Sequence, residues 1–217
     1  MDADWIRADW PAAAHIVAGT TLRDRHDFAF PAPPRWLKQV HGSRVVHLDV
    51  DEPGKAAPEA DASVAASPGA ICAVCTADCL PILLVGEDGR AIGAAHAGWR
   101  GLAAGIAENT VASMASKPER LLAWLGPAIS QPNFEVGAEV REAFIAHDPA
   151  AEAAFEMNPR GRWQADLYLL ARQRLAAAGV SRVFGGGLCT YADAERFYSY
   201  RRNRDTGRLV SFVYRAR

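Results

Sequence analysis

Residues 71–101 read ICAVCTADCLPILLVGEDGRAIGAAHAGWRG, and they carry a clear pattern of strands. It holds two short apolar runs, 71–75 and 81–85, separated by the polar step Thr76-Ala77-Asp78-Cys79. Apolar runs of this length, bounded by turn residues, are typical of buried strands. Glu87-Asp88-Gly89 has the residues of a hairpin turn, so residues 90–96 are predicted to return as the next strand. The stretch therefore predicts three strands in succession.

Downstream of His96 the apolar residues recur every four positions, which is the period of an amphipathic helix. The residues of this face are Leu102, Ile106, Thr110 and Met114. One continuous helix is predicted, beginning just past Gly98-Trp99-Arg100-Gly101 and ending before Pro118.

Two more helices and several strands complete the expected order of elements. One helix covers about 136–147, and the other begins after an N-cap at Asp166 and ends at Gly179. Further strands are expected at 14–21, 44–50, 121–125, 182–185, 197–200 and 208–214. Because hairpin signals accompany alternating strands and helices, the predicted class is α/β (α+β). We expect a mixed-sheet sandwich with flanking helices, in a single domain over residues 1–217.

Composition narrows the classes of function. The chain has 217 residues and a formal net charge of −1, which gives no basic footprint for nucleic acid. The longest apolar stretch, 70–86, is interrupted by Asp78 and Pro81, so no membrane span is predicted. The acidic start, MDADWIRADW, lacks the apolar core of a secretion signal. These features predict a cytoplasmic protein with neither a nucleic acid nor a membrane as its partner.

The four cysteines, Cys72, Cys75, Cys79 and Cys189, are expected to be reduced thiols in that compartment. Three of them fall within eight residues, which calls for a packing or a chemical reason. Cys72 and Cys75 are three apart in a strand and so point to opposite faces. Cys72 is predicted to be a core residue, Cys75 a second thiol near a site, and Cys189 a structural residue.

Three potential metal ligands stand beside small residues at predicted strand ends: His41, Cys79 and His96. Two imidazoles and one thiolate, with a fourth position open, are the arrangement of a catalytic zinc. Bound zinc lowers the pKa of its water toward about 7. Each residue also has a purely structural interpretation, as a buried apolar thiol or a hydrogen-bonded histidine. Spacing along the chain does not place His41 beside the other two.

Two arginines are candidate anion contacts. Arg100 stands at the start of the predicted helix, where free backbone N–H groups attract anions. Arg201 lies in the run Phe197-Tyr198-Ser199-Tyr200-Arg201-Arg202, which joins aromatic rings to cations. The structural alternatives are a surface arginine and a solvated edge strand.

Together these segments resemble one family, the laccase-domain proteins known as polyphenol oxidase, peptidoglycan editing factor and purine nucleoside phosphorylase. The resemblance is specific because the chain contains three motifs of this family in the family's order: Q-V-H-G, D-C-x-P and H-A-G-W-R-G. The matching stretches are 38–42, 61–62, 76–81, 94–101, 125–129, 166–167, 189–190, 197–202 and 207–208. The chain departs from the family in having a shorter stretch between its first strand and Q-V-H-G.

The resemblance implies a mixed α/β sandwich and a single zinc held by His41, Cys79 and His96. It implies phosphorolysis of adenosine, inosine, guanosine and methylthioadenosine, together with adenosine deamination. Arg23 matches the arginine that ends the family's first strand motif and is a further candidate anion contact.

Several functions are therefore weighed. For the nucleoside enzyme, Asp78 is the candidate acid/base group, with an orienting or turn-capping role as its alternative, and Cys79 and Arg100 join it as catalytic residues. Arg23, Arg100 and Arg201 would contact nucleoside or phosphate, in a monomer or weak homodimer.

The alternatives share the same residues. An amidase editing peptidoglycan precursors would use Cys79 as nucleophile with His96 or His41 as base. Copper-dependent phenol oxidation is a third interpretation, but six histidines without a His-x-His pair cannot build a multicopper cluster in one chain. Copper remains an alternative occupant of the zinc site. A non-catalytic, metal-stabilised module is the fourth.

Overall fold

The apolar runs of residues 71–97 form three strands that follow one another along the chain. In the computed structural model, which describes residues 5–24, 28–50 and 56–216, they are β5 (Ile71–Thr76), β6 (Leu80–Gly86) and β7 (Ile92–Ala97). β6 and β7 pair antiparallel through the predicted turn, where Gly89 has a φ of 68°. β5 belongs to a different sheet.

β6 and β7 lie within a six-stranded sheet of order β12-β8-β6-β7-β4-β3. Its other strands are β3 (Val45–His47), β4 (Ala62–Ala65), β8 (Leu121–Leu125) and β12 (Arg182–Gly185). The pairs β12–β8 and β3–β4 are parallel, whereas the remaining pairs are antiparallel. The sheet is therefore mixed, as predicted.

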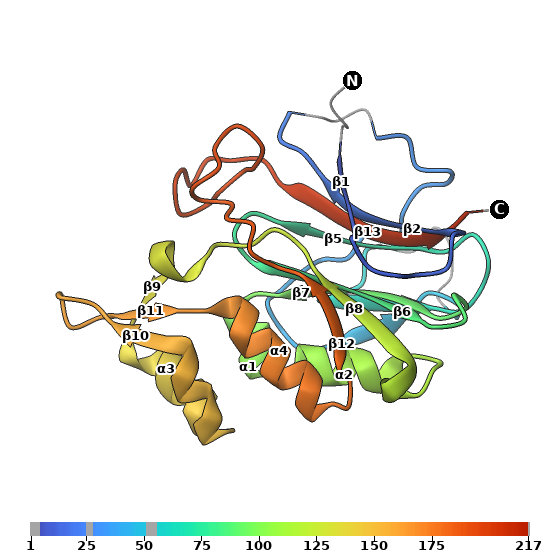
Figure 1. Ribbon diagram of the computed structural model, residues 1–217. Helices are drawn as coiled ribbons and strands as arrows, with labels where there is room; N and C mark the ends of the chain where they lie inside the picture. Colours follow the sequence, from blue (N-terminus) through green and yellow to red (C-terminus); the bar gives the residue numbers. More distant parts are fainter. Residues whose placement is uncertain (1–4, 25–27, 51–55, 217) are drawn as a thin grey trace.

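A four-stranded antiparallel sheet packs over one face of the six-stranded sheet (Figure 1). Its strands run in the order β1 (Trp5–Arg7), β2 (Ile16–Thr21), β13 (Leu209–Arg215) and β5. The core between the sheets includes Cys72 and Val74 from β5 and Leu83 and Val85 from β6. Alternate residues of each strand fill it because successive strand side chains point to opposite faces.

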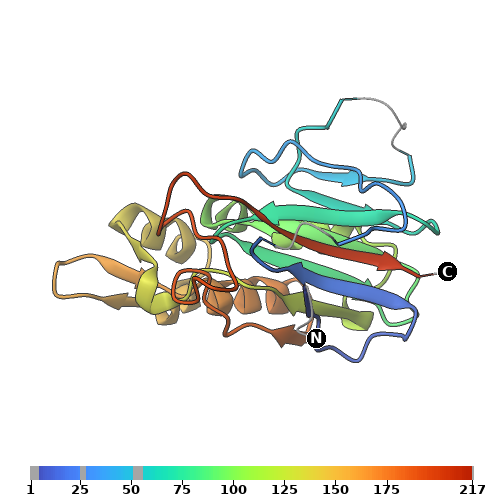
Figure 2. The ribbon, with the colours of Figure 1, turned by 90° about the horizontal axis from the view of Figure 1, so that it is seen from above.

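Helices cover the other face of the six-stranded sheet, giving a third layer (Figures 1 and 2). They are α1 (Trp99–Ala103), α2 (Ile106–Ser113) and α4 (Leu167–Ala177). Leu80, Ile82 and Leu84 of β6 share one buried cluster with residues of these helices. The Asp166 carboxylate caps α4 by accepting from the Leu169 amide at 3.0 Å, as its sequence predicts. The fold is thus a mixed α/β sandwich with flanking helices.

A smaller unit extends from one end of the layers in Figure 1. It contains α3 (Ala138–Ile145) and a three-stranded sheet of order β10-β11-β9. Those strands are β9 (Glu135–Val136), β10 (Phe155–Met157) and β11 (Trp163–Ala165). Short 3₁₀ helices occupy Pro118–Arg120, Gln131–Asn133 and Pro149–Ala154.

Two expected elements are wrong. The single helix expected just past residue 101 begins earlier, at Trp99, and is two helices, because Gly105 adopts a left-handed φ of 91° between α1 and α2. The expected strand 197–200 is an irregular loop segment, and the neighbouring Arg202 side chain donates to the carbonyls of Thr190, Tyr191 and Phe197. These side-chain bonds take the place of strand pairing.

The expected strand 44–50 is shorter than predicted and covers only Val45–His47. Residues 51–55, which belong to the loop after it, lie outside the described residues. Within the described part of the chain, none of the helices combines the length and apolarity needed to cross a bilayer.

Candidate metal centre

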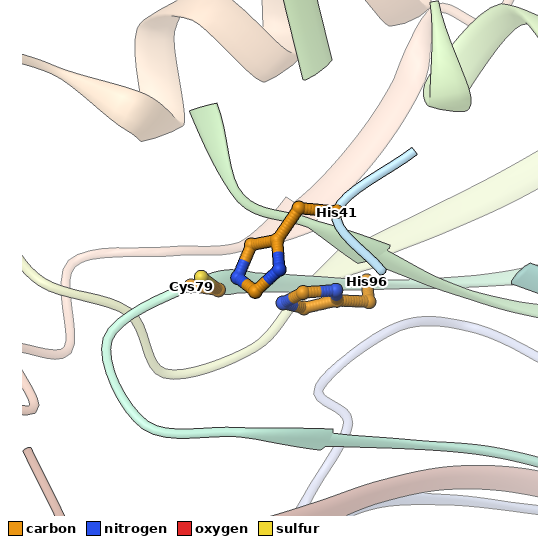
Figure 3. Close-up of side chains that lie close together, drawn as sticks. All are labelled: His41, Cys79 and His96. Carbon is orange, nitrogen blue, oxygen red and sulfur yellow. The ribbon is translucent and has the colours of Figure 1, made fainter. Parts of the chain in front are cut away.

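Three segments bring His41, Cys79 and His96 together (Figure 3). His41 comes from the loop before β3, Cys79 from the turn between β5 and β6, and His96 from β7. Their ligand atoms all lie within 4.8 Å of one another, and this is the one such group of His, Cys, Asp and Glu found in the described ranges. The two imidazole rings meet edge to face at 74°. The tertiary structure therefore supplies the proximity that spacing could not, and the cluster could bind a metal ion.

Asp61 holds two of these potential ligands in place. Its Oδ1 lies 2.8 Å from His96 Nδ1 and accepts from the His41 amide at 2.9 Å. Its Oδ2 accepts from the amides of Val40 and Gly42 at 3.1 and 2.7 Å. The contact to Nδ1 leaves Nε2 of His96 as the nitrogen available to a metal, the usual histidine–carboxylate arrangement at metal sites.

Asp61 was not among the predicted site residues. Its signal in the sequence was an acidic residue directly before a strand of small residues, 62–65, within one of the matching stretches. In the fold its carboxylate is fully buried, which is expected only when its acceptor positions are satisfied.

The loop that carries His41 is fastened to an open edge of β5. The Gln39 side chain donates to the Cys75 carbonyl and accepts from the Cys75 amide, both at 2.8 Å. This pair of bonds imitates strand pairing at the edge of the four-stranded sheet. His41 itself has a left-handed φ of 61°, which costs energy in a residue with a Cβ. The bonds of Gln39 and Asp61 hold that conformation.

Glycine at position 98 permits close approach of the ligands. A Cβ there would lie 2.8 Å from Cys79 Sγ and 3.3 Å from His41 Cδ2. At position 101, a Cβ would lie 2.8 Å from the Gly42 carbonyl oxygen. Both glycines of the Gly98-Trp99-Arg100-Gly101 stretch are therefore required by the packing of the His41 loop against α1.

Hydrogen bonds within the cluster shift the pKa values of Cys79 and His96 in opposite directions. Burial alone would raise the pKa of the Cys79 thiol, but hydrogen bonds with His41 and His96 outweigh it and lower the pKa to about 6. Burial likewise opposes protonation of His96, yet hydrogen bonds with Asp61 and Cys79 raise its pKa to about 9. An electron-rich sulfur beside two imidazoles is a donor set suited to a dication.

Asp78 has a structural task at the turn before Cys79. Its carboxylate accepts from Thr190 Oγ1 at 2.6 Å, from Ser199 Oγ at 3.0 Å and from the Arg201 amide at 2.6 Å. Its own backbone has a φ of 89°. The carboxylate therefore ties the 190–201 loop to the turn that carries Cys79.

Cavities surround the cluster. The largest at the site, of about 730 Å³, is lined by all three potential ligands together with Trp36, Tyr200, Arg100 and Arg208. A small apolar cavity of about 130 Å³ also touches Cys79. A third, polar cavity of about 300 Å³ shares Arg100 with the first and Trp99, Phe134 and Arg201 with the second. The three cavities thus adjoin one another around α1.

Of the three arginines predicted to contact anions, two line the cavities at the site and one lies elsewhere. Arg100 lies at the site, exposed and with its guanidinium 4.5 Å from the centre of the Trp99 ring. Arg201 lines the neighbouring cavities and donates to the Glu135 carbonyl at 3.1 and 3.2 Å. Arg23 lies apart from these cavities, where it donates to the Ala194 carbonyl at 3.0 Å.

The other cysteines lie where they were expected. Cys72 is fully buried in the core between the sheets. Cys75 lines the 730 Å³ cavity beside the cluster. Cys189 accepts from the Ser130 amide at 3.5 Å and from Asn133 Nδ2 at 3.3 Å, contacts that connect two loops.

Comparison with known proteins identifies the family. The model of the multi-copper polyphenol oxidoreductase laccase family matches residues 14–216. The chain belongs to this family, as its motifs predict.

Particular relatives carry a different functional name. "Purine nucleoside phosphorylase YfiH" of Shigella flexneri is 55% identical over 184 residues, which cover 85% of this chain and 74% of the relative. "Purine nucleoside phosphorylase PA4543" of Pseudomonas aeruginosa is 45% identical, covering 97% of this chain and 98% of the relative. Protein NMB0706 of Neisseria meningitidis has a crystal structure that superposes with a TM-score of 0.90 at 38% identity, over 99% of this chain and 100% of that one. The relatives support an enzyme that acts on small molecules.

Proposed function

We propose that this protein is a zinc-dependent purine nucleoside phosphorylase with additional adenosine deaminase activity. Its substrates would be adenosine, inosine, guanosine and methylthioadenosine, and its products from phosphorolysis a free base and the sugar 1-phosphate. The observation that carries the proposal is the His41, Cys79 and His96 cluster at the wall of a 730 Å³ cavity, in a chain similar to named purine nucleoside phosphorylases. We place the enzyme in the cytoplasm, as a monomer or weak homodimer.

Zinc is the metal that the donor set favours. His41, Cys79 and His96 would hold it, leaving a coordination position toward the cavity, and copper is the alternative occupant. Bound zinc would act as a Lewis acid and lower the pKa of a water molecule in the site. Asp61 keeps the His96 ring in the orientation that this ligation requires.

The cavity suits a nucleoside in size and in lining. Its volume of about 730 Å³ falls within the range of pockets that bury small ligands. Trp36 and Tyr200 line it and leave 42% and 49% of their surface exposed. Flat aromatic rings that are solvent-exposed at a cavity offer stacking surfaces for a purine base. Arg100 and Arg208 supply positive charge for phosphate and for the negative charge that develops during its attack.

Of the remaining predicted residues, Asp78 is proposed as a positioning residue. Its carboxylate is already engaged by three donors, which favours the orienting alternative over proton transfer. Through the Arg201 amide it fixes the loop that brings Tyr200 and Arg201 to the cavities. Arg23 would contribute only if substrate reached the 194–198 segment, beside which its side chain lies.

A product assay tests the proposal. The zinc-loaded protein is incubated with adenosine or inosine, with and without phosphate, and products are separated by chromatography beside Cys79→Ala. Free base that appears only with phosphate, and is lost in the variant, supports phosphorolysis; inosine formed from adenosine supports deamination. If folded, zinc-loaded protein yields neither product, the purine proposal is overturned. Activity on muropeptide precursors that survives chelation would then favour Cys79 as an amidase nucleophile, since a thiolate nucleophile needs no metal.

A further inference from the structure

The polar cavity of about 300 Å³ lies beside the metal cluster without including any of its potential ligands. Three arginines from three separate segments line it: Arg100 from α1, Arg162 from the hairpin between β10 and β11, and Arg201 from the 190–203 loop. Only the first and third were candidates from the sequence. Arg162 reaches the cavity because the smaller sheet folds against α1 and the loop.

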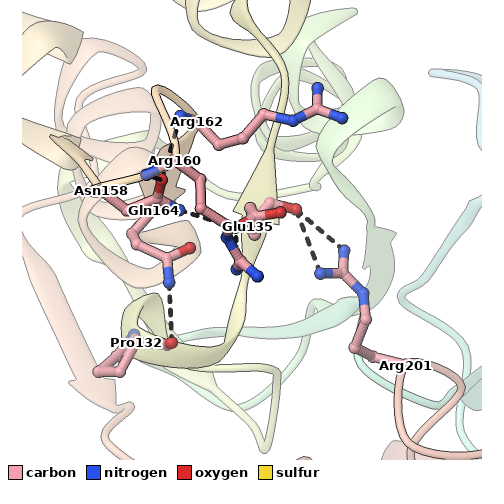
Figure 4. Close-up of polar contacts among 7 residues, drawn as sticks. All are labelled: Pro132, Glu135, Asn158, Arg160, Arg162, Gln164 and Arg201. Carbon is pink, nitrogen blue, oxygen red and sulfur yellow. Dashed lines mark hydrogen bonds and ion pairs between the residues drawn. The ribbon is translucent and has the colours of Figure 1, made fainter.

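Within the described residues none of the three guanidinium groups forms an ion pair with an acidic side chain, although Arg162 lies near enough to the Glu135 carboxylate to help lower its pKa. Arg100 packs on the Trp99 ring, and Arg201 donates to the main-chain carbonyl of Glu135. For Arg162, the described part of the chain provides a main-chain bond to Asn158 but no ion pair for the guanidinium. Figure 4 shows the Arg162 side chain extending away from the Glu135 contact, whereas Arg160 turns toward it.

Two carboxylates, those of Glu135 and Glu139, line the same cavity and offset part of the positive charge of the three arginines. Glu135 is already engaged, by an ion pair with Arg160 and by Asn158 Nδ2 at 2.7 Å. The Glu139 carboxylate folds back over Gly137 at the start of α3, where the helix dipole favours negative charge. The cavity therefore keeps an excess of positive charge.

We propose that this cavity is a phosphate subsite and that Arg162 is one of its binding residues; the proposal rests on the phosphorylase function above. At about 300 Å³ the cavity is less than half as large as the one that suits the nucleoside, so it fits a small anion. Arginine forks pair with phosphate oxygens through two parallel bonds. Arg100 lines both cavities and marks where phosphate and nucleoside would meet.

The ligand is thus a phosphate group, either inorganic phosphate or the ester phosphate of a nucleotide. Arg162→Gln tests it because the side chain is exposed and its removal leaves the core intact. Arg120→Gln is the matched control: it removes the same charge from an exposed arginine paired with Glu87, outside the three cavities. Binding of inorganic phosphate and of inosine 5′-monophosphate is measured by calorimetry on zinc-loaded protein, with inosine as the uncharged reference.

We expect Arg162→Gln to weaken phosphate binding about tenfold, the value of a charge-assisted contact in a solvated groove. Inosine binding and zinc content should be unchanged, and Arg120→Gln should match the parent protein. If the parent protein binds inorganic phosphate more tightly than inosine 5′-monophosphate, the ligand of the cavity is the inorganic phosphate used as co-substrate. If the nucleotide binds more tightly, the ligand is the ester phosphate of a nucleotide. If Arg162→Gln binds inorganic phosphate and inosine 5′-monophosphate as tightly as the parent protein does, the proposed subsite is overturned. The binding measurement does not depend on turnover, so the two proposals can fail separately. Phosphate binding that depends on Arg162, in a protein that forms no free base in the product assay, would refute the proposed function and leave the subsite standing.

Discussion

Replacing Asp61 by asparagine tests the claim that one buried carboxylate organises the candidate metal centre. The carboxylate accepts from four donors: the amides of Val40, His41 and Gly42, and the ring of His96. An asparagine side chain keeps one oxygen as an acceptor and has an NH₂ group in place of the other. That NH₂ group would face N–H groups of the protein, to which it cannot hydrogen-bond. Two of the four contacts are therefore lost, whichever way the amide is oriented.

The magnitude follows from those contacts. A hydrogen bond to a charged group contributes about 1.5–3 kcal/mol, so a rigid site would lose about 3–6 kcal/mol. The 39–42 loop is only partly buried and can relax, so we expect a loss of about 2–4 kcal/mol in the free energy of unfolding. Zinc affinity should fall by about 10- to 100-fold, because outer carboxylates orient metal-binding histidines.

Urea unfolding gives the first quantity, and competition with a chromophoric chelator gives the second. Asp49→Asn is the control, since that carboxylate also accepts two backbone amides, Ala66 and Ser67, but lies outside the metal cluster. It should lower stability modestly and leave zinc affinity unchanged. An Asp61→Asn protein with the parent's stability and zinc affinity would refute the reasoning.

Three further substitutions probe the site and the fold. Gly98→Ala puts a Cβ 2.8 Å from Cys79 Sγ, so zinc affinity should fall at least about tenfold with the circular dichroism spectrum unchanged; parent-like affinity would contradict this. Cys79→Ser should abolish zinc retention in metal analysis, whereas Cys75→Ser should retain zinc because its thiol is outside the ligand group. Gly105→Ala should lower the urea-derived stability by about 1 kcal/mol, since a φ of 91° strains any residue with a Cβ and the nearest atoms leave room for one; a neutral effect would show that the backbone relaxes.

The features that depend on local pattern could be predicted from the sequence. The runs 71–75 and 81–85, the turn at Gly89 and the Asp166 cap predicted strands, a hairpin and a helix start, and all are present. These features are local because strand burial, turn geometry and capping act within a few residues. The chemistry of the three potential ligands was equally legible, because it belongs to the side chains.

Contacts between residues far apart in the sequence became visible in the folded chain alone. The Asp78 carboxylate bonds to residues 112, 121 and 123 positions away, and Asp61 joins His96 across 35 positions. Such contacts depend on strand register and loop closure, which no local period encodes. For the same reason the 197–200 segment is an irregular loop: the Ser199 hydroxyl donates to Asp78, and the Phe197 carbonyl accepts from Arg202. The sequence pointed to the three potential ligands, and the packing of two sheets and a helix layer placed them around one point.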